Sequence, residues 1–395
     1  MSNHYLMPTY NRQPILFTRG EGCWLFDDAG NRYLDGIAGI AVCNLGHCHP
    51  AVTRTLCEQA ATLVHTSNLY RVGPQEKLAT LLCQTAGMEK AFFSNSGAEA
   101  NEAAIKLARL YGHKKGVDNP TIIVMESAFH GRTMATLTAT GNRKAQAGFE
   151  PLVSGFVRAP WNDLDAVKKI AGNNRDVVAV MLEPIQGEGG VNPLSAGYLK
   201  ALREFCDAHE LLLILDEIQT GNGRTGSYFA YQQEGIIPDV VTTAKGLGNG
   251  FPIGACLAAG RAADVFSPGT HGSTYGGNPL GCATAVTVVE TLNAGVIDAV
   301  PARGEFLRQA LRDAFADITM VTEVRGQGLI NGVQFDRPCG ELVGLCRERG
   351  LLINVTAESV VRLIPPLVIS EEEITILVER LKDAVLAFVA AQEAA

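Results

Sequence analysis

The chain has 395 residues, of which 47% are hydrophobic and 19% charged, and its formal net charge is -8. This composition is typical of a soluble globular protein with two or three domains, and it excludes disordered and fibrous classes. The mild acidity and the lack of an apolar run of about 18 residues give no reason to expect nucleic acid or a membrane as a partner, and no secretory signal is recognisable at the start.

The first 50 residues are rich in Gly, Asp and Asn and contain short strand-like pieces at 22–26 and 32–34. We expect this segment to pack with the C-terminal part of the chain. His47, Cys48 and His49 could suggest a metal, but adjacent ligands point in different directions and no second pair follows, so a polar turn is the better interpretation. The ten cysteines form no C-x-x-C pair, which favours free thiols in a reducing cytoplasm.

Residues 51–295 alternate between apolar runs and helical patterns. The runs at 91–93, 121–125, 177–182, 211–215, 239–243 and 254–259 indicate buried strands, and 98–110 and 197–209 are among the helical stretches between them. Near-continuous apolar strands that alternate with helices predict an α/β fold with a mostly parallel sheet covered on both faces.

Residues 296–395 predict a smaller α+β domain. After a first helix come a strand near 328–334, a helix near 341–349 and short strands at 352–355 and 361–364. A final helix begins at Ser370, where Ser370 and Glu373 have the spacing of a capping box.

Two residues at predicted strand ends have complementary chemistry. Asp216 closes the run 211–215, where a carboxylate is costly without a partner, and Lys245 follows the run 239–243 among small residues. Desolvation would make the Lys245 amine nucleophilic, and a pyridine aldehyde cofactor needs such an amine and an anion at its ring nitrogen. The alternatives are a structural ion pair or N-cap for Asp216 and a snorkelling strand-end lysine.

Two glycine-containing segments could bind phosphate. Residues 94–102 follow a strand and open a helix, so Ser96 and Gly97 could form an anion site, although the same residue types also simply cap helices. Residues 221–226 fit G-x-G-x-x-G, but an aromatic, polar segment follows where a dinucleotide fingerprint requires a helix. No P-loop motif occurs in the chain.

Six motifs resemble one known family. They are SNSGAEANEAA, FHGRT, EPIQGEGG, LDEIQTGNGRTG, KGLGNGFPIGA and HGSTYGGNPL, in this order along the chain. On these motifs the chain is identified as a class III, fold-type I aminotransferase dependent on pyridoxal 5'-phosphate, and the resemblance covers nearly its whole length. Within the class it most resembles the acetylornithine aminotransferases, with ornithine, succinylornithine and 4-aminobutyrate aminotransferases as close relatives.

The resemblance implies a role for each motif residue. Lys245 would bond covalently to the cofactor and shuttle the proton, and Asp216 would pair with the pyridinium nitrogen. The remaining implied cofactor contacts are Ser96, Gly97 and Ala98 at the phosphate, Phe129 and Ile218 on the two ring faces, Gln219 at the ring hydroxyl, and Glu217 beside them. Thr274 would reach the phosphate of the neighbouring subunit, which implies a homodimer, and Ser273 would lie near the substrate. Ala98 and Ile218 stand where many relatives have threonine and valine.

The resemblance also implies how one site accepts two substrates. Arg132 would bind the carboxylate far from the reacting amine, and Arg362 the carboxylate beside it, which only glutamate has. Glu188 would neutralise Arg362 when acetylornithine is bound, because an unpaired buried charge is costly. The alternatives are a solvated loop carboxylate for Glu188, an edge-strand cation for Arg362 and a capping or solvent-facing group for Arg132.

We therefore predict a transaminase of arginine biosynthesis that uses N-acetylornithine and 2-oxoglutarate, with 51–295 as its cofactor domain and 296–395 plus 1–50 as its small domain. Succinylornithine, N-succinyl-diaminopimelate, ornithine and 4-aminobutyrate are alternative amino donors. A fold-type I racemase, decarboxylase or aminomutase would not need the Glu188–Arg362 pair. A non-catalytic cofactor-binding protein is disfavoured because Lys245 and Asp216 are both present, and a dehydrogenase because no helix is expected after Gly226. No metal is expected.

Overall fold

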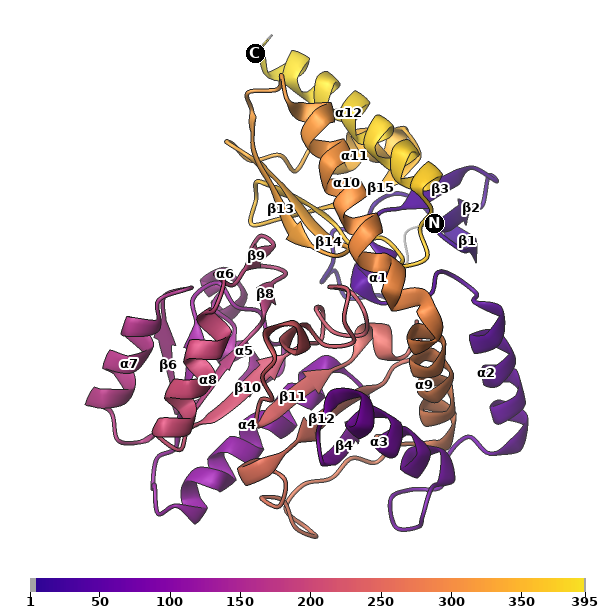
Figure 1. Ribbon diagram of the computed structural model, residues 1–395. Helices are drawn as coiled ribbons and strands as arrows, with labels where there is room; N and C mark the ends of the chain where they lie inside the picture. Colours follow the sequence, from indigo (N-terminus) through magenta and orange to yellow (C-terminus); the bar gives the residue numbers. More distant parts are fainter. Residues whose placement is uncertain (1–4, 394–395) are drawn as a thin grey trace.

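The computed structural model describes residues 5–393. Figure 1 shows a larger part, built around one sheet, below a smaller part that contains the first strands and the last helices. Strands and helices from the two ends of the chain thus lie together.

The central sheet of the larger part has seven strands. Their order is β4 (Lys90–Ser94), β12 (Gly254–Ala258), β11 (Val240–Thr243), β10 (Leu212–Asp216), β7 (Val177–Leu182), β5 (Thr121–Met125) and β6 (Phe156–Ala159). β12 runs antiparallel to both of its neighbours, β11 and β4, and the other six strands all run in one direction. The mostly parallel sheet is confirmed, and β6 escaped prediction because its four residues include an arginine and form no apolar run.

Successive residues of the strands face two separate cores, as the two-residue period of a strand requires. In β10, Leu213 and Leu215 belong to the core formed with α3 (Gly73–Ala86), α8 (Tyr198–Ala208) and α9 (Pro279–Thr291). Leu212 and Ile214 belong to the core formed with α4 (Gly97–Lys114). Burying each such side chain contributes roughly 1.5–3 kcal/mol, so the sheet holds helices firmly on both faces.

The remaining helices of the larger part are α1 (Ala38–Ala41), α2 (Pro50–Thr62), α5 (Met134–Ala139), α6 (Arg143–Gln146) and α7 (Leu164–Asn173), with a hairpin of β8 (Ile185–Gln186) and β9 (Asn192–Pro193). The stretch Pro279–Phe315 is long and apolar enough to cross a membrane by length and composition alone. Within it, however, α9 packs against α2 and α3, with Cys282, Ala285 and Val288 fully buried. We therefore interpret α9 as a core helix.

The smaller part combines both ends of the chain (Figure 1). One sheet has the order β1 (Phe17–Glu21), β2 (Trp24–Asp27), β3 (Arg32–Asp35) and β15 (Leu351–Leu352), and the other β13 (Val321–Gln327), β14 (Ile330–Phe335), β17 (Val360–Leu363) and β16 (Asn354–Thr356). Helices α10 (Val300–Phe315), α11 (Leu342–Glu348) and α12 (Glu371–Glu393) complete it. Because β3 pairs with β15, the N-terminal strands join a C-terminal strand in one sheet.

The start of α12 contains the predicted capping box. Glu373 N donates to Ser370 Oγ at 3.1 Å, and Ser370 N donates to Glu373 Oε2 at 3.0 Å. Trp24 Nε1 also donates to Glu373 Oε1 at 2.8 Å. Glu373 therefore caps the helix and ties it to β2.

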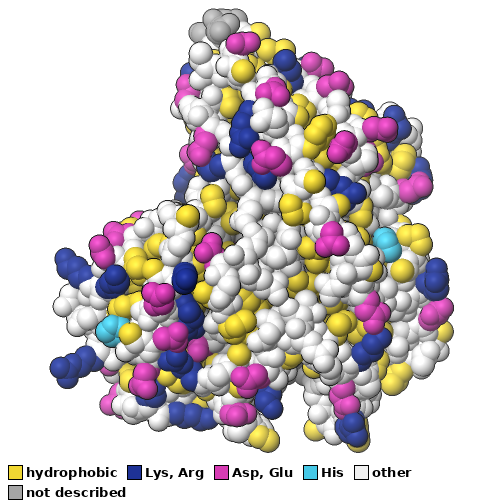
Figure 2. Space-filling model, in the orientation of Figure 1, with side chains coloured by type: hydrophobic (Ala, Val, Ile, Leu, Met, Phe, Trp, Pro, Cys, Tyr) yellow, Lys and Arg dark blue, Asp and Glu magenta, His cyan; other side chains and the backbone are white. Residues whose placement is uncertain are grey.

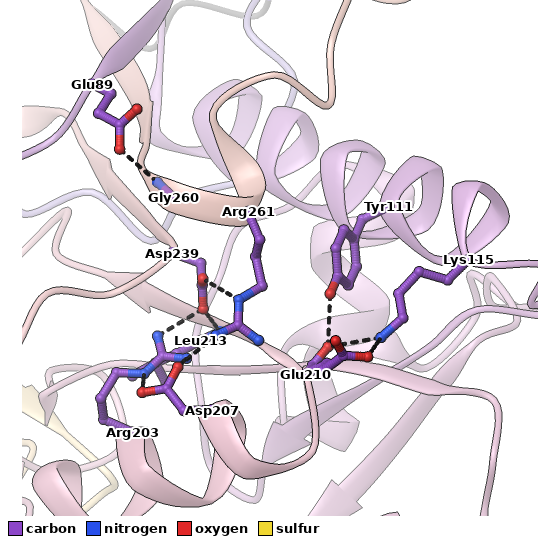
Figure 3. Close-up of polar contacts among 10 residues, drawn as sticks. All are labelled: Glu89, Tyr111, Lys115, Arg203, Asp207, Glu210, Leu213, Asp239, Gly260 and Arg261. Atoms are coloured by element: carbon purple, nitrogen blue, oxygen red, sulfur yellow. Dashed lines mark hydrogen bonds and ion pairs between the residues drawn. The ribbon is translucent and has the colours of Figure 1, made fainter.

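An ionic cluster lies at the amino ends of the parallel strands (Figure 3). Arg203 Nη1 pairs with Asp239 Oδ2 at 2.7 Å, and Arg261 Nε lies 3.2 Å from Asp239 Oδ1. Asp239 also accepts from Leu213 N at 2.8 Å. Elsewhere on the surface, basic and acidic side chains are interspersed over the face drawn in Figure 2.

Candidate functional site

A cavity of about 400 Å³ lies at the carboxyl ends of β4, β10 and β11, the edge where a parallel sheet presents its ligand-binding groups. Ten residues predicted for the site line it: Ser96, Gly97, Ala98, Phe129, Arg132, Glu188, Asp216, Ile218, Gln219 and Lys245. Segments more than a hundred residues apart in the sequence thus meet at one sheet edge.

Lys245 lies in the tight turn that follows β11, with a φ of 45°. This left-handed conformation is uncommon for a residue with a side chain, and such strain clusters at functional sites. Burial lowers the pKa of Lys245, and the charge of Arg362 lowers it further, while Glu188 and Asp216 act in the opposite direction. The amine is therefore more easily deprotonated than an ordinary lysine amine.

Asp216 ends β10, and its carboxylate is almost completely buried. Its Oδ2 accepts from Asn101 Nδ2 at 2.7 Å and lies 2.8 Å from His130 Nδ1, and its Oδ1 accepts from Ile218 N at 3.1 Å. These partners hold the acid in one orientation at the cavity wall. Asp216 and Lys245 therefore face the same cavity.

His130 and Asn101 are site residues that the sequence analysis missed. Burial disfavours a charged His130 ring, but the hydrogen bond and the charge of Asp216 outweigh it, and the pKa of His130 is raised. Asn101 is held in turn by Thr242 Oγ1, which donates to its Oδ1 at 2.7 Å. Both could have been found from their positions in the sequence, because His130 directly follows Phe129 and Asn101 lies one helical turn after Gly97.

Glu183, at the end of β7, is a third residue that was missed. Its carboxylate accepts from Phe129 N at 2.9 Å and Gly187 N at 3.1 Å, so it joins two loops of the cavity wall. Burial raises the pKa of Glu183 to about 7, with His130 lowering it and Asp216 raising it. Burial therefore favours the protonated form of this carboxyl more than water does.

The amino end of α4 forms one side of the cavity. Ser96 is its N-cap, and Ser96 Oγ accepts from Glu99 N at 3.2 Å. A side chain at Gly97 would place its Cβ 2.8 Å from Ile218 Cδ1, so glycine allows α4 to approach Ile218 closely. The free N–H groups of this first turn favour an anion.

The predicted arginine and glutamate pair is present at the cavity. Arg362 Nη1 pairs with Glu188 Oε1 at 2.6 Å and donates to Gln219 Oε1 at 3.2 Å. The Arg362 side chain is completely buried, whereas the Glu188 side chain is 35% exposed. Arg132 is exposed, with its guanidinium 5.7 Å from the centre of the Phe129 ring. One arginine thus already has an anion partner, and the other faces the open side.

Four predicted residues lie outside the lining of this cavity: Arg362, which is joined to the lining residues Glu188 and Gln219, and Glu217, Ser273 and Thr274. Ser273 and Thr274 line a neighbouring cavity of about 340 Å³, which shares Asn95 with the first. Glu217 is buried, and its carboxylate accepts hydrogen bonds from Thr220 Oγ1, Ala230 N and Tyr231 N. These donors belong to the chain that follows β10, and Glu217 does not line the cavity. These bonds identify Glu217 as a residue that shapes the turn after β10.

The geometry allows a defined chemistry. An amine with a lowered pKa and a buried acid face one space, a helix N-terminus offers an anion site at its edge, and two arginines approach from the smaller part and from the loop before α5. Such a set suits an aromatic, phosphate-bearing cofactor and a substrate with two acidic ends.

Comparisons with known proteins give a consistent result. The model of the family "Aminotransferase class-III" matches residues 5–385. An acetylornithine aminotransferase of Nitrosomonas europaea is 56% identical over 93% of this chain and 94% of its own, and acetylornithine aminotransferase 1 of Bordetella bronchiseptica is 50% identical over 97% and 98%.

Solved structures are similar as well. The ornithine aminotransferase of Toxoplasma gondii superposes with a TM-score of 0.94 at 34% identity, covering 98% of this chain and 94% of its own. The N-acetylornithine aminotransferase of Stenotrophomonas maltophilia has a TM-score of 0.85 at 38% identity, with 97% and 98% covered.

Proposed function

The chain belongs to the class III aminotransferase family, and on this premise we propose that it transfers the terminal amino group of N2-acetyl-L-ornithine to 2-oxoglutarate. The products are N-acetyl-L-glutamate 5-semialdehyde and L-glutamate, a step of arginine biosynthesis. The observation that carries the proposal is the buried Arg362 paired with Glu188, which lines the same cavity as Lys245. A donor without a carboxylate beside its reacting carbon needs such an internal partner for the arginine.

The cavity residues fit pyridoxal phosphate as the cofactor. Lys245 would anchor it, Asp216 would meet its ring nitrogen, and Ser96, Gly97 and Ala98 would hold its phosphate. Support comes from the depressed pKa of Lys245 and from the close approach of Gly97 to Ile218. When bound, the cofactor supplies an electron-accepting ring for the charge left on the amine-bearing carbon.

The proton chemistry falls to Lys245. Because burial lowers its pKa, Lys245 is more readily neutral than an ordinary lysine, so its Nζ could take the proton from the substrate carbon and would pass it on to the cofactor carbon. The bonds from His130 and Asn101 fix the Asp216 carboxylate so that it stays directed at the cavity. Phe129 and Ile218, which come from two different motifs, would lie on the two faces of the cofactor ring, and Gln219 would hydrogen-bond the ring hydroxyl.

Two arginines divide the substrate carboxylates in this proposal. Arg132 takes the distal carboxylate of either substrate, and its exposed position at the cavity is suited to incoming ligands. Arg362 takes the carboxylate beside the reacting carbon of glutamate. Glu188 keeps Arg362 neutralised when acetylornithine is bound and moves aside for glutamate. Its partial exposure leaves it room to do so.

We further propose a cytoplasmic homodimer in which Thr274 completes the neighbouring subunit's site and Ser273 lies near the substrate. Thr274 lines a cavity adjacent to the proposed site, at a surface that includes the exposed Tyr275. Mixing a K245A protein with a T274A protein tests this arrangement. Activity is regained on subunit exchange if each subunit completes its partner's site, and stays absent if sites are independent.

A half-reaction panel tests the substrate. Holoenzyme is mixed with N-acetylornithine, succinylornithine, ornithine, N-succinyl-diaminopimelate or 4-aminobutyrate, and the loss of the cofactor's absorbance is followed. We expect the ratio of the half-reaction rate constant to the dissociation constant to be highest with N-acetylornithine. A higher value with ornithine would favour the activity named for the Toxoplasma gondii neighbour and contradict the proposal.

A further inference from the structure

The G-x-G-x-x-G segment at 221–226 lies at the junction of the larger and smaller parts. Turns follow it instead of a helix, and the next element is the short 3₁₀ turn Ala230–Glu234, so it lacks the dinucleotide geometry. Its arginine, Arg224, is one of the two largest completely buried side chains described. Burial lowers the pKa of Arg224 to about 9, with Asp35 acting in the opposite direction. A charge buried at such cost calls for a specific role.

Arg224 ties together the end of the strand that carries Arg362, β17, and the start of its neighbour β14. Its Nη1 donates to Pro365 O at 2.5 Å and to Leu329 O at 3.0 Å, and Leu329 N donates back to Arg224 O at 2.9 Å. Pro365 lies three residues after Arg362, and Leu329 immediately precedes β14, which pairs with β17 at Arg362. The Arg224 guanidinium therefore helps to fix the backbone position of Arg362.

Arg224 is linked in the other direction to the segment that carries Lys245. Its Nη2 donates to Asn44 Oδ1 at 2.5 Å, and Asn44 Nδ2 donates to Asn222 O at 2.9 Å. Asn222 Nδ2 then donates to Thr243 Oγ1 at 2.9 Å and Ala244 O at 3.1 Å, directly before Lys245.

These links form one continuous path of buried hydrogen bonds. Asn44, Asn222 and Arg224 are each at most 1% exposed. Asn44 O also accepts from Leu367 N at 2.7 Å, which ties the N-terminal segment to the stretch between β17 and α12. Because each group is withdrawn from water, losing its partner would leave a buried polar atom without a hydrogen bond, which is destabilising. We therefore expect the path to hold the segments of Arg362 and Lys245 at a fixed separation.

We propose that Arg224, through Asn44 and Asn222, is a positioning residue that sets the location of Arg362 relative to Lys245. The inference rests on the proposed function, in which Arg362 binds the carboxylate beside the reacting carbon of glutamate. Only the glutamate half-reaction uses that contact. Misplacing Arg362 by a fraction of an ångström therefore weakens glutamate binding much more than N-acetylornithine binding, because the carboxylate of N-acetylornithine binds Arg132 while Arg362 stays paired with Glu188.

The test compares R224K and N44D with wild type. Lysine keeps the charge but not the forked donors, and aspartate keeps a partner for Arg224 while losing the donor to Asn222 O. N44D therefore cuts the path on the lysine side without removing Arg224. The matched control is R203K, in the ionic cluster at the opposite edge of the sheet (Figure 3), where the arginine is also mostly buried.

The readout is the dissociation constant and rate of each half-reaction, with the absorbance maximum of the bound cofactor and the melting temperature. We expect R224K and N44D to raise the dissociation constant for glutamate by about tenfold, the size of one weakened charged hydrogen bond, and that for N-acetylornithine less than twofold. R203K lowers the melting temperature and changes neither constant. Equal weakening of both donors, or a lowered melting temperature alone, would overturn the inference.

The outcome is separable from that of the proposed function. The wild-type panel alone decides which amine is the donor. If that donor proves to be another amine without a carboxylate beside its reacting carbon, it replaces N-acetylornithine in the comparison, and the ratio to glutamate still tests Arg224.

Discussion

Replacing Glu188 with Gln removes the anion that neutralises Arg362 and keeps the size of the side chain. Arg362 is completely buried, and its pair with Glu188 Oε1 is 2.6 Å long, while Gln219 and Asn354 offer only neutral oxygens at 3.2 Å. Two unit charges about 4 Å apart interact by roughly 4 kcal/mol at an effective dielectric constant of about 20. Because Glu188 is 35% exposed, solvent screens part of this, and we expect a loss of about 1.5–3 kcal/mol.

That loss falls on one substrate only. With N-acetylornithine bound, Arg362 in E188Q has no anion, and the half-reaction slows by about 10- to 100-fold in rate over dissociation constant. With glutamate bound, the substrate carboxylate pairs with Arg362 and no internal anion must be displaced. The glutamate half-reaction therefore stays equal or becomes faster.

Single-turnover absorbance changes of holoenzyme with each donor measure both effects. E305Q is the control, since Glu305 pairs with Arg308 and Arg312 on α10, away from the cavity. If E188Q changes the two half-reactions by the same factor, Glu188 does not act as the counter-ion of Arg362 in a substrate-dependent way, and the switch is wrong.

Three further predictions follow from single residues. K245A is expected to lose at least about 10³-fold in turnover, because the proton-transferring amine is removed from the cavity. Steady-state turnover checks this, calorimetry of the cofactor-free proteins checks that the fold is kept, and substantial turnover would contradict the role of Lys245. E217Q tests a pH effect: burial raises the pKa of Glu217 from 4.5 to about 7, so the wild type loses stability as pH rises through that range, by about 3 kcal/mol between pH 4 and 8. Urea unfolding of wild type and E217Q at pH 4 and pH 8 measures this. The difference in free energy of unfolding should shift in favour of E217Q by that amount as the pH rises, and a pH-independent difference would refute the prediction. S370A removes the acceptor for Glu373 N and should destabilise α12 by about 1 kcal/mol, measured against S267A, whose hydroxyl caps no helix; equal effects of the two changes would contradict the capping role.

Much of the architecture followed from local pattern. The strands β5 and β7 were predicted with the observed bounds, and β10, β11 and β12 within one residue at each end, because a buried parallel strand needs a near-continuous apolar run. The capping box at Ser370 is equally local. β6 and β13 were missed because their residues carry polar side chains and are only partly buried. The domain boundaries and the roles of the site residues stay predictions.

Sequence alone determined which residue types stand at strand ends, since an acid or a lysine directly after an apolar run reaches the carboxyl edge of the sheet. Tertiary structure decided which groups those residues meet. Glu188 and Arg362 lie 174 positions apart, and the partners of Asp216 come from a helix and a loop. It also decided that Glu217 faces a turn and that Arg224, in a motif suggestive of nucleotides, is buried between the two parts. Periodicity reports burial of a face, whereas the direction of a side chain and its partner depend on contacts between distant segments.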